Sequence, residues 1–222
     1  MLKILGKSPS INVRKVMWVC DELDLPFEHE EWGAGFRSTQ VPKFLSLNPN
    51  GMVPVIIDDG FVLWESNTIC RYLAARCARH DLLPITPRER ACAEQWMDWQ
   101  ATEFNNSWCY AFMGLVRHSP DHQDPSLLAS GIANWNRHMQ MLDGQLARTQ
   151  AFVTGEIFTL ADIVLGLSAQ RWLVAPIERP DLPAVRAYRA KLSERPGFLK
   201  HAVNGMLCAS ITNPSVPSDR CW

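Results

Sequence analysis

The first third of the chain alternates short apolar runs with amphipathic segments. Residues 2–5 form a short, mainly apolar run closed by turn residues, and they predict a strand. Residues 27–32, which are mostly polar between Phe27 and Trp32, look like a second strand. Between them, apolar residues recur at helical spacing from Asn12 until Leu25-Pro26 ends the pattern. A strand, a helix and a second strand in this order predict two parallel strands joined by a crossover.

The next segment predicts a hairpin followed by a helix. Residues 55–57 and 61–63 are apolar and flank Asp58-Asp59-Gly60, and Asp-Gly between apolar runs is a strong hairpin signal. Ser66 is the predicted N-cap of a helix that continues to about Arg76. Together with a short helix in residues 42–47, these elements predict a mixed sheet of four strands with the order βαβ-α-ββ-α.

The pattern changes after residue 84. Strand signals vanish, and long helical patterns separated by prolines begin at Pro87, a residue type that the first helical turn tolerates. We therefore expect a first domain over residues 1–80, a linker near residues 79–86, an all-helical domain over residues 87–205, and a loosely ordered tail over residues 206–222. The predicted fold class is α+β, with a mixed domain first and an all-α domain second.

Composition and charge narrow the classes of function. Hydrophobic residues make up 47% of the chain and the formal net charge is −1, which is ordinary for a globular protein and offers no basic footprint for nucleic acid. No apolar stretch approaches the ~20 residues that span a bilayer, and the first residues do not resemble a signal peptide. Neither nucleic acid nor membrane is therefore an expected partner, and the composition leaves a polar small-molecule ligand open.

The cysteines and histidines indicate neither a disulfide framework nor a metal. The seven cysteines are odd in number, scattered and without a C-x-x-C pair, which predicts a reducing compartment and hence a cytoplasmic protein. Cys20 and Cys70 fall at apolar positions of helical segments, where a thiol behaves as a small hydrophobe. The six histidines show no ligand spacing, so no metal is expected.

Pro54 is the first residue of chemical interest. It follows Asn48-Pro49-Asn50-Gly51-Met52-Val53 and directly precedes a predicted strand, where the missing N–H of proline is tolerated. If the Val53–Pro54 bond is cis, Val53 could turn its N–H and C=O outward and pair with an extended peptide ligand. On the local sequence alone, a trans proline that starts a strand is the favoured interpretation.

Two helix starts carry further candidate groups. Glu65 and Ser66 lie where the hairpin passes into a helix, so they could hold the ammonium and the carboxylate of an α-amino acid end. Ser10 and Asn12 lie at the first strand-to-helix junction, where a hydroxyl donor and the helix dipole would lower the free-thiol pKa of ~8.5. Taken alone, each pair is better explained as an ordinary helix cap.

The order of these three elements resembles the glutathione transferase family. A serine lies at the first helix start, N-P-N-G-x-V-P precedes a hairpin, and E-S opens the next helix. The resemblance covers the whole chain, as a thioredoxin-like half, a linker and an all-helical half, and residues 10–16 look like the serine-type bacterial, theta and phi enzymes. It implies a homodimer that uses glutathione as co-substrate without a metal.

The resemblance also implies a role for each matching residue. Ser10 would hydrogen-bond the glutathione thiolate with the help of Asn12. Val53, held by Pro54, would pair with the cysteinyl backbone of glutathione.

The residues that would bind the γ-glutamyl end of glutathione fit the family pattern better than those that would bind its glycyl end. Glu65 and Ser66 would hold the γ-glutamyl end. Phi enzymes carry basic residues where this chain has Thr39 and Gln40, and a glutamine where it has Met52. Gln40 is therefore expected to contact glutathione with an uncharged amide where phi enzymes use a basic side chain. Arg37 is the candidate for the glycyl carboxylate because a guanidinium pairs well with carboxylates, although a solvated surface arginine is an equal alternative.

The helical half contributes candidates of its own. Trp108 and Phe112 are four residues apart, hence on one helix face, and are candidate walls of the electrophile pocket, although core packing explains most aromatic residues of this segment. In residues 158–163, Thr159 and Asp162 read as a capping box that serves folding rather than catalysis.

The predicted function is transfer of the glutathione thiolate to a small hydrophobic electrophile, with Ser10 as the hydrogen-bond donor that stabilises the sulfur anion. A glutathione-dependent peroxidase or dehalogenase and a glutathione-binding interaction module are the alternatives. A glutaredoxin-type redox enzyme is disfavoured because it needs a cysteine near the first helix start, and Cys20 falls deep in the helix.

Overall fold

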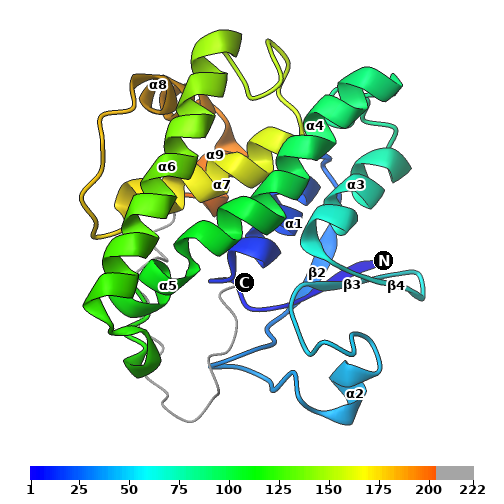
Figure 1. The fold of residues 1–222 in the computed structure, drawn as a ribbon. Helices are drawn as coiled ribbons and strands as arrows, with labels where there is room; N and C mark the ends of the chain where they lie inside the picture. The colour runs from blue at the N-terminus through cyan, green and yellow to red at the C-terminus, as the bar shows by residue number, and fades with distance from the viewer. Residues whose placement is uncertain (204–222) are drawn as a thin grey trace.

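Four short strands form one mixed sheet at the N-terminal end of the chain. The computed structural model describes residues 1–203, and Figure 1 shows the sheet beside a bundle of helices. The strands are β1 (Leu2–Leu5), β2 (Phe27–Glu30), β3 (Val55–Asp58) and β4 (Phe61–Trp64). Their order is β2-β1-β3-β4, with β1 parallel to β2 and antiparallel to β3, and with β3 antiparallel to β4. The crossover and the hairpin are thus confirmed.

Helices cover both faces of this sheet because its strands alternate their apolar side chains. Ile4 and Ile56 point into the large core that contains α1 (Ile11–Glu22) and α3 (Ser66–Arg76). Their neighbours Leu5 and Val55 point to the other face, where they form a small cluster with Trp32 and with Phe44 of α2 (Pro42–Leu45). The alternation follows from the two-residue period of a strand.

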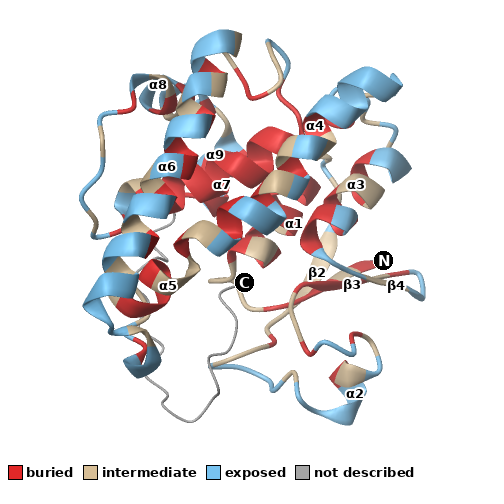
Figure 2. Cartoon of the chain, viewed as in Figure 1, coloured by how far each residue is buried: buried red, intermediate tan, exposed pale blue. Residues whose placement is uncertain are grey.

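The rest of the described chain is helical. Its elements are α4 (Pro87–Trp99), a π-helix (Gln100–Phe104), α5 (Asn105–Leu115), a 3-10 helix (Pro120–His122), α6 (Pro125–Thr149), α7 (Leu160–Val174), α8 (Pro183–Leu192) and α9 (Pro196–His201). Proline occupies the first positions of α4, α6, α8 and α9, where the N–H that it lacks would have no intrahelical partner. Figure 2 shows α7 buried at the centre of the bundle.

A buried carboxylate holds the start of α7. Asp162 accepts hydrogen bonds from the backbone N–H groups of Val153 and Thr159, both at 2.8 Å, and from the Tyr188 hydroxyl at 3.0 Å. Thr159 and Asp162 form the capping box that the sequence predicts. Burial raises the pKa of Asp162 to about 6, because these bonds offset only part of the cost of removing the charge from water. The motif thus organises the helix that carries the core.

The α+β fold class is confirmed, but some details differ from the expectations. Ser66 is the first residue of α3 rather than its cap, since Glu65 occupies the cap position. The helical run from Pro87 is interrupted by the π-helix, whose apolar spacing resembles that of an ordinary helix. Cys109 is disulfide-bonded, which the interpretation of the cysteines did not foresee.

Other expectations are not decided by the fold. The domain boundaries at residues 80 and 87 stay predictions, and the predicted tail at residues 206–222 lies outside the described residues. Among residues 1–203, no helix has the length and apolar character needed to cross a membrane.

Candidate active site

Ser10 lies directly before the first helix, as the sequence predicts. Ser10 is the N-cap of α1: its N–H bonds to the Lys7 carbonyl at 3.0 Å, and its carbonyl accepts from the N–H of Arg14 at 3.0 Å. Its hydroxyl makes no capping bond. It therefore lies where a helix N-terminus and a hydroxyl donor can act together on an anion.

Ser8, the other serine before α1, is already engaged. Its hydroxyl donates to Glu31 Oε1, and its backbone N–H donates to Glu31 Oε2 at 2.9 Å. A hydroxyl that donates its proton to a carboxylate cannot also donate it to a thiolate. The geometry therefore favours Ser10 over Ser8.

Asn12 lies in the first turn of α1, and its amide is incompletely bonded. Its Oδ1 is buried and has no hydrogen-bond partner within the described part of the chain. Buried polar atoms in folded proteins nearly always have a partner, so such an atom next to a helix start is a candidate ligand contact.

The segment before β3 presents its backbone in an unusual conformation. The Val53–Pro54 peptide bond is cis, so the trans interpretation favoured by the local sequence is wrong. Asn48 braces the preceding loop by donating to the Met52 carbonyl at 2.8 Å and by accepting from the N–H of Asn50 at 3.0 Å.

This segment also comes close to α1. Gly6, with a φ of +154°, allows the approach, because a Cβ at this position would lie 3.0 Å from Val53 Cβ and 2.5 Å from Val13 Cγ2. Gly6 therefore lets the Val53–Pro54 segment and the start of α1 face the same region.

The start of α3 contains a strained residue. Glu65 has a φ of +74°, in the region that favours glycine, and it occupies the cap position of α3. Ser66, the first helical residue, is 7% exposed. A non-glycine residue in such a conformation costs about 1–3 kcal/mol, and residues of this kind cluster at functional sites. The strain therefore supports a binding role for the Glu65 carboxylate.

Arg37 and Gln40 lie in the long loop after β2. Arg37 forms an ion pair with Glu30 at 2.7 Å and lies 5.6 Å from the centre of the Trp32 ring, with 63% of its side chain exposed. The Gln40 amide packs where Gly51 leaves room for it. Their proposed contacts with glutathione stay predictions, and Arg37 would have to leave Glu30 to make its own.

Trp108 and Phe112 share one face of α5, but this face is buried. They are 1% and 3% exposed, and their rings meet edge to face at 5.3 Å. Trp108 packs on Trp135 at 5.6 Å. Almost none of their ring surface is exposed to a ligand in this structure, so their role as pocket walls stays a prediction.

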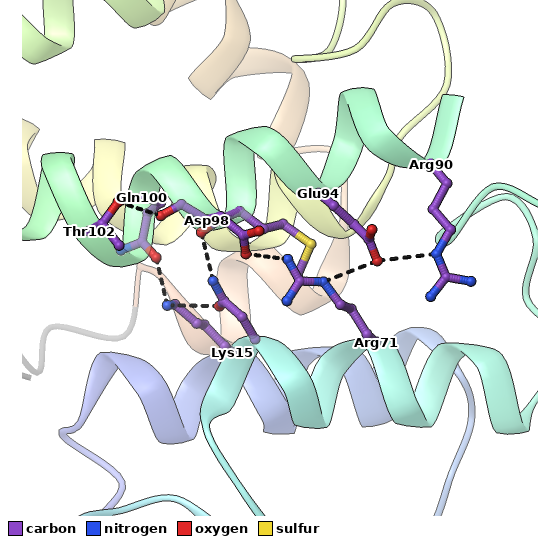
Figure 3. A network of polar contacts seen from close by, with 9 residues as sticks. Lys15, Arg71, Arg90, Glu94, Asp98, Gln100 and Thr102 are labelled. Carbon is purple, nitrogen blue, oxygen red and sulfur yellow. Dashed lines mark hydrogen bonds and ion pairs between the residues drawn. The ribbon is translucent and has the colours of Figure 1, made fainter. Parts of the chain in front are cut away.

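A buried lysine behind the start of α3 escaped the sequence analysis. Lys15 is 1% exposed and donates to Gln100 Oε1 at 2.8 Å and to Asn67 Oδ1 at 3.2 Å (Figure 3). Asn67 in turn donates to the Met97 carbonyl at 2.7 Å. Burial lowers the pKa of Lys15 to about 7. The two amide oxygens carry no net charge, so they replace only part of the stabilisation that water gives to an ammonium.

This network connects four elements near the candidate site. Figure 3 shows Lys15 from α1 below the π-helix and Arg71 from α3 beside α4. Arg71 pairs with Glu94 at 3.3 Å and with Asp98. The sequence contains one signal for Lys15, because it lies four residues after Ile11 and three before Trp18, on the apolar face of α1.

A thioredoxin-like sheet followed by a helical bundle, with Ser10, a cis Val53–Pro54 bond and Glu65-Ser66 in the first part, defines the class of protein. Residues 1–75 match the family described as "Glutathione S-transferase, N-terminal domain". The chain is 34% identical to Glutathione S-transferase GstB of Escherichia coli (strain K12), over 90% of this chain and 97% of that relative. It is 32% identical to Glutathione S-transferase 3 of Zea mays, over 98% of this chain and 97% of that one.

A solved structure supports the same assignment. The theta class glutathione S-transferase from Xanthomonas axonopodis pv. citri, with glutathione bound, superposes with a TM-score of 0.85 at 36% identity, covering 92% of this chain and 98% of that one. The chain therefore belongs to the glutathione S-transferase family, and its class of activity is glutathione transfer. The resemblance inferred from the sequence is confirmed.

Proposed function

We propose that this protein binds glutathione between the starts of α1 and α3 and that Ser10 stabilises the glutathione thiolate for attack on a small electrophile. The observation that carries the proposal is the position of Ser10, at the N-cap of α1 with no capping bond from its hydroxyl. The helix dipole and the hydroxyl donor both favour the anion over the thiol.

We assign the remaining contacts of glutathione to Asn12, Val53, Glu65 and Ser66. The backbone of Val53, before the cis proline, pairs with the cysteinyl residue of glutathione, as a peptide pairs with an exposed strand. Glu65 accepts from the γ-glutamyl ammonium, while Ser66 and the start of α3 bind its carboxylate. Asn12 contacts the sulfur or orients the Ser10 hydroxyl.

The reaction needs no covalent enzyme intermediate. The thiol proton leaves to solvent, the sulfur forms a bond to the electrophilic carbon, and the leaving group departs with its electron pair. Ser10 acts through its hydrogen bond to the sulfur, and the loss of one such donor typically costs ~10²-fold or more in rate.

Titration of the bound thiol tests the proposal. Thiolate absorbance is followed against pH for bound glutathione, with the wild-type protein and with Ser10→Ala. We expect a thiol pKa below the free value of ~8.5 in the wild type and a return toward it in the variant. Equal titration curves would remove Ser10 from the mechanism, and glutathione binding without any pKa depression would favour an interaction module.

A homodimer in the cytoplasm is part of the same proposal. β4 is an edge strand, and its Phe61 and Trp64 side chains are 49% and 37% exposed, which suits a protein contact. Sedimentation equilibrium of the wild type and of Trp64→Glu tests the contact, since a dimer through this strand weakens when the indole is replaced by a carboxylate.

A thiol-reductase function finds no support in Cys20 or Cys70. Cys20 and Cys70 are fully buried, and burial raises the pKa of Cys70 to about 12 and that of Cys20 further. Thiols of this kind are not nucleophiles at neutral pH. The structure thus supports the sequence argument against Cys20 as a nucleophile.

A further inference from the structure

Arg171 of α7 is a buried cation with unsatisfied donors. It is 5% exposed, and its Nε and Nη1 have no hydrogen-bond partner within the described chain. Its guanidinium lies over two aromatic rings, at 4.5 Å from the centre of Phe112 and 4.8 Å from that of Trp108. Aromatic faces attract a cation but accept no strong hydrogen bonds. The Nε and Nη1 donors of Arg171 are therefore available to another acceptor.

Three further basic side chains gather at the same place. Arg117, just after α5, lies 5.5 Å from the centre of the Phe112 ring. Arg14 of α1 is 5% exposed and donates to the His201 carbonyl at 3.0 Å. Lys7 lies in the loop before Ser10 and packs its side chain against Gly33.

These four residues, called here the cationic cluster, repel one another. Burial and then the charge of Arg117 lower the pKa of Arg14 to about 10 and also lower the pKa of Lys7. Burial and the charges of Arg14 and Arg117 lower the pKa of Arg171. No carboxylate of residues 1–203 forms an ion pair with Lys7, Arg117 or Arg171. Buried cations normally have a counter-charge, so an anion bound beside Lys7, Arg117 and Arg171 would stabilise these three side chains.

The cationic cluster lies beside the proposed sulfur site. Lys7 is three residues before Ser10, and Arg14 is one helical turn after it on α1. Arg117 and Arg171 come from the helical half, which in the proposed function supplies the electrophile pocket, and both lie against Phe112. Glu65 and Ser66, the proposed contacts of the γ-glutamyl end, belong to another element, the start of α3.

We infer that the co-substrate of this protein is an organic anion, an electrophile with a carboxylate group that the N–H donors of Arg171 and Arg117 bind while its electrophilic carbon faces the sulfur at Ser10. The inference rests on the proposed glutathione transfer and names the substrate class of that site. It replaces the purely hydrophobic electrophile expected from the sequence, because a wholly apolar molecule would leave the donors of Arg171 without an acceptor.

A matched pair of aryl chlorides tests the charge requirement. 4-Chloro-3,5-dinitrobenzoate and its amide have the same reacting carbon and differ in charge. In each reaction the glutathione sulfur bonds to the ring carbon, chloride leaves, and the thiol proton goes to solvent. The readout is kcat/KM for each electrophile divided by its uncatalysed rate constant with glutathione.

We expect the wild type to prefer the carboxylate by ~10-fold or more, the size of one hydrogen bond to a charged group. Arg171→Met removes the preference by raising KM for the carboxylate, while KM for glutathione stays the same. Arg179→Met is the matched control, because Arg179 also lies over a tryptophan, Trp172 at 5.5 Å, but outside the cationic cluster. It should keep the preference.

Two further arms keep the test decisive. Arg117→Met replaces a half-buried residue, and we expect it to reduce the preference even if Arg171→Met fails to fold. Isothermal titration with unreactive 3,5-dinitrobenzoate and 3,5-dinitrobenzamide measures the anion preference without turnover. If glutathione transfer is absent but only the benzoate binds, the proposed function fails and the anion site stands.

Three outcomes would overturn the inference. The first is equal wild-type efficiency with the benzoate and the benzamide together with equal binding of the unreactive pair. The second is an equal loss of both activities in Arg171→Met and Arg117→Met. The third is a rise in KM for glutathione alone, which would assign the cationic cluster to a glutathione carboxylate.

Discussion

Glu31 binds both the hydroxyl and the backbone N–H of Ser8, the second of these at 2.9 Å. One carboxylate thus fixes the turn that precedes α1 and uses the donor that Ser8 could have offered to a ligand. Ser10, two residues later, is left with its hydroxyl outside any capping bond. Two serines only two residues apart therefore differ in their hydrogen bonds.

The two serines should differ in kinetics. Ser10→Ala should lower kcat/KM by ~10²-fold, because the thiolate loses its donor. Ser8→Ala should stay within ~10-fold of the wild type and should reduce the free energy of unfolding by about 1–3 kcal/mol, since Glu31 loses a partner. Steady-state assays and urea unfolding of both variants give the comparison. A larger kinetic loss for Ser8→Ala would exchange the two assignments.

Substitutions of Glu65 should change the stability of the protein and its affinity for glutathione in different ways. Glu65→Gly removes the strain of the positive φ, so the free energy of unfolding should stay level or rise by up to about 1 kcal/mol, while glutathione binding weakens. Glu65→Gln keeps the strain and loses the charge, so it should weaken binding by ~10-fold or more without a gain in stability. Titration calorimetry with glutathione and thermal unfolding measure both effects. Full binding by Glu65→Gly would exclude an ion pair with the γ-glutamyl ammonium.

Lys15 should make the stability of the protein depend on pH. Its pKa in the folded state, about 7, lies below the ordinary lysine value of 10.5, so the unfolded chain binds more protons between these two pH values. The free energy of unfolding should therefore rise with pH in this window, and the cost of the buried charge is fully present below it. Between about pH 7 and about pH 9, Lys15 should raise the free energy of unfolding of the wild type by about 2 kcal/mol, and Lys15→Met should not show this rise.

Lys43, an exposed lysine in α2, provides the control for this measurement. Lys43→Met should reproduce the pH profile of the wild type in urea unfolding. If Lys15→Met also reproduced it, the Lys15 ammonium would have an ordinary pKa in the folded protein.

Asp162 should be among the most costly positions to change. Asp162→Ala leaves two buried N–H groups and the Tyr188 hydroxyl without their acceptor, which should reduce the free energy of unfolding by about 3–5 kcal/mol. Thr159→Ala removes only the capping partner and should cost about 0.5–2 kcal/mol. Chemical unfolding ranks the two variants, and a larger loss for Thr159→Ala would contradict the network described here.

Local signals predicted most of the first half of the fold. Asp-Gly between apolar runs located the hairpin, and the helical spacing after Ser66 located α3 to within a residue. The cap position was missed because Glu65 adopts a conformation that nothing in its residue type suggests. The cis bond at Pro54 was missed on local grounds because tertiary contacts select the isomer.

The polar interior of the site could not be predicted from the pattern. A lysine in an amphipathic helix reads as a solvated residue, whereas Lys15 is buried because amide oxygens from two other elements surround its ammonium. The cationic cluster joins residues 7, 14, 117 and 171, and no local pattern connects positions so far apart. Such groups become visible only when the helices pack together.

The π-helix from Gln100 to Phe104 has an implication for how this protein could acquire new substrates. One surplus residue in a helical turn rotates everything that follows by roughly 100° about the axis. A single-codon deletion here would rotate Trp108, Phe112 and Arg117 about that axis relative to the residues that precede Gln100. In this chain, one turn of backbone thus sets which face of α5 lies under the Arg171 guanidinium.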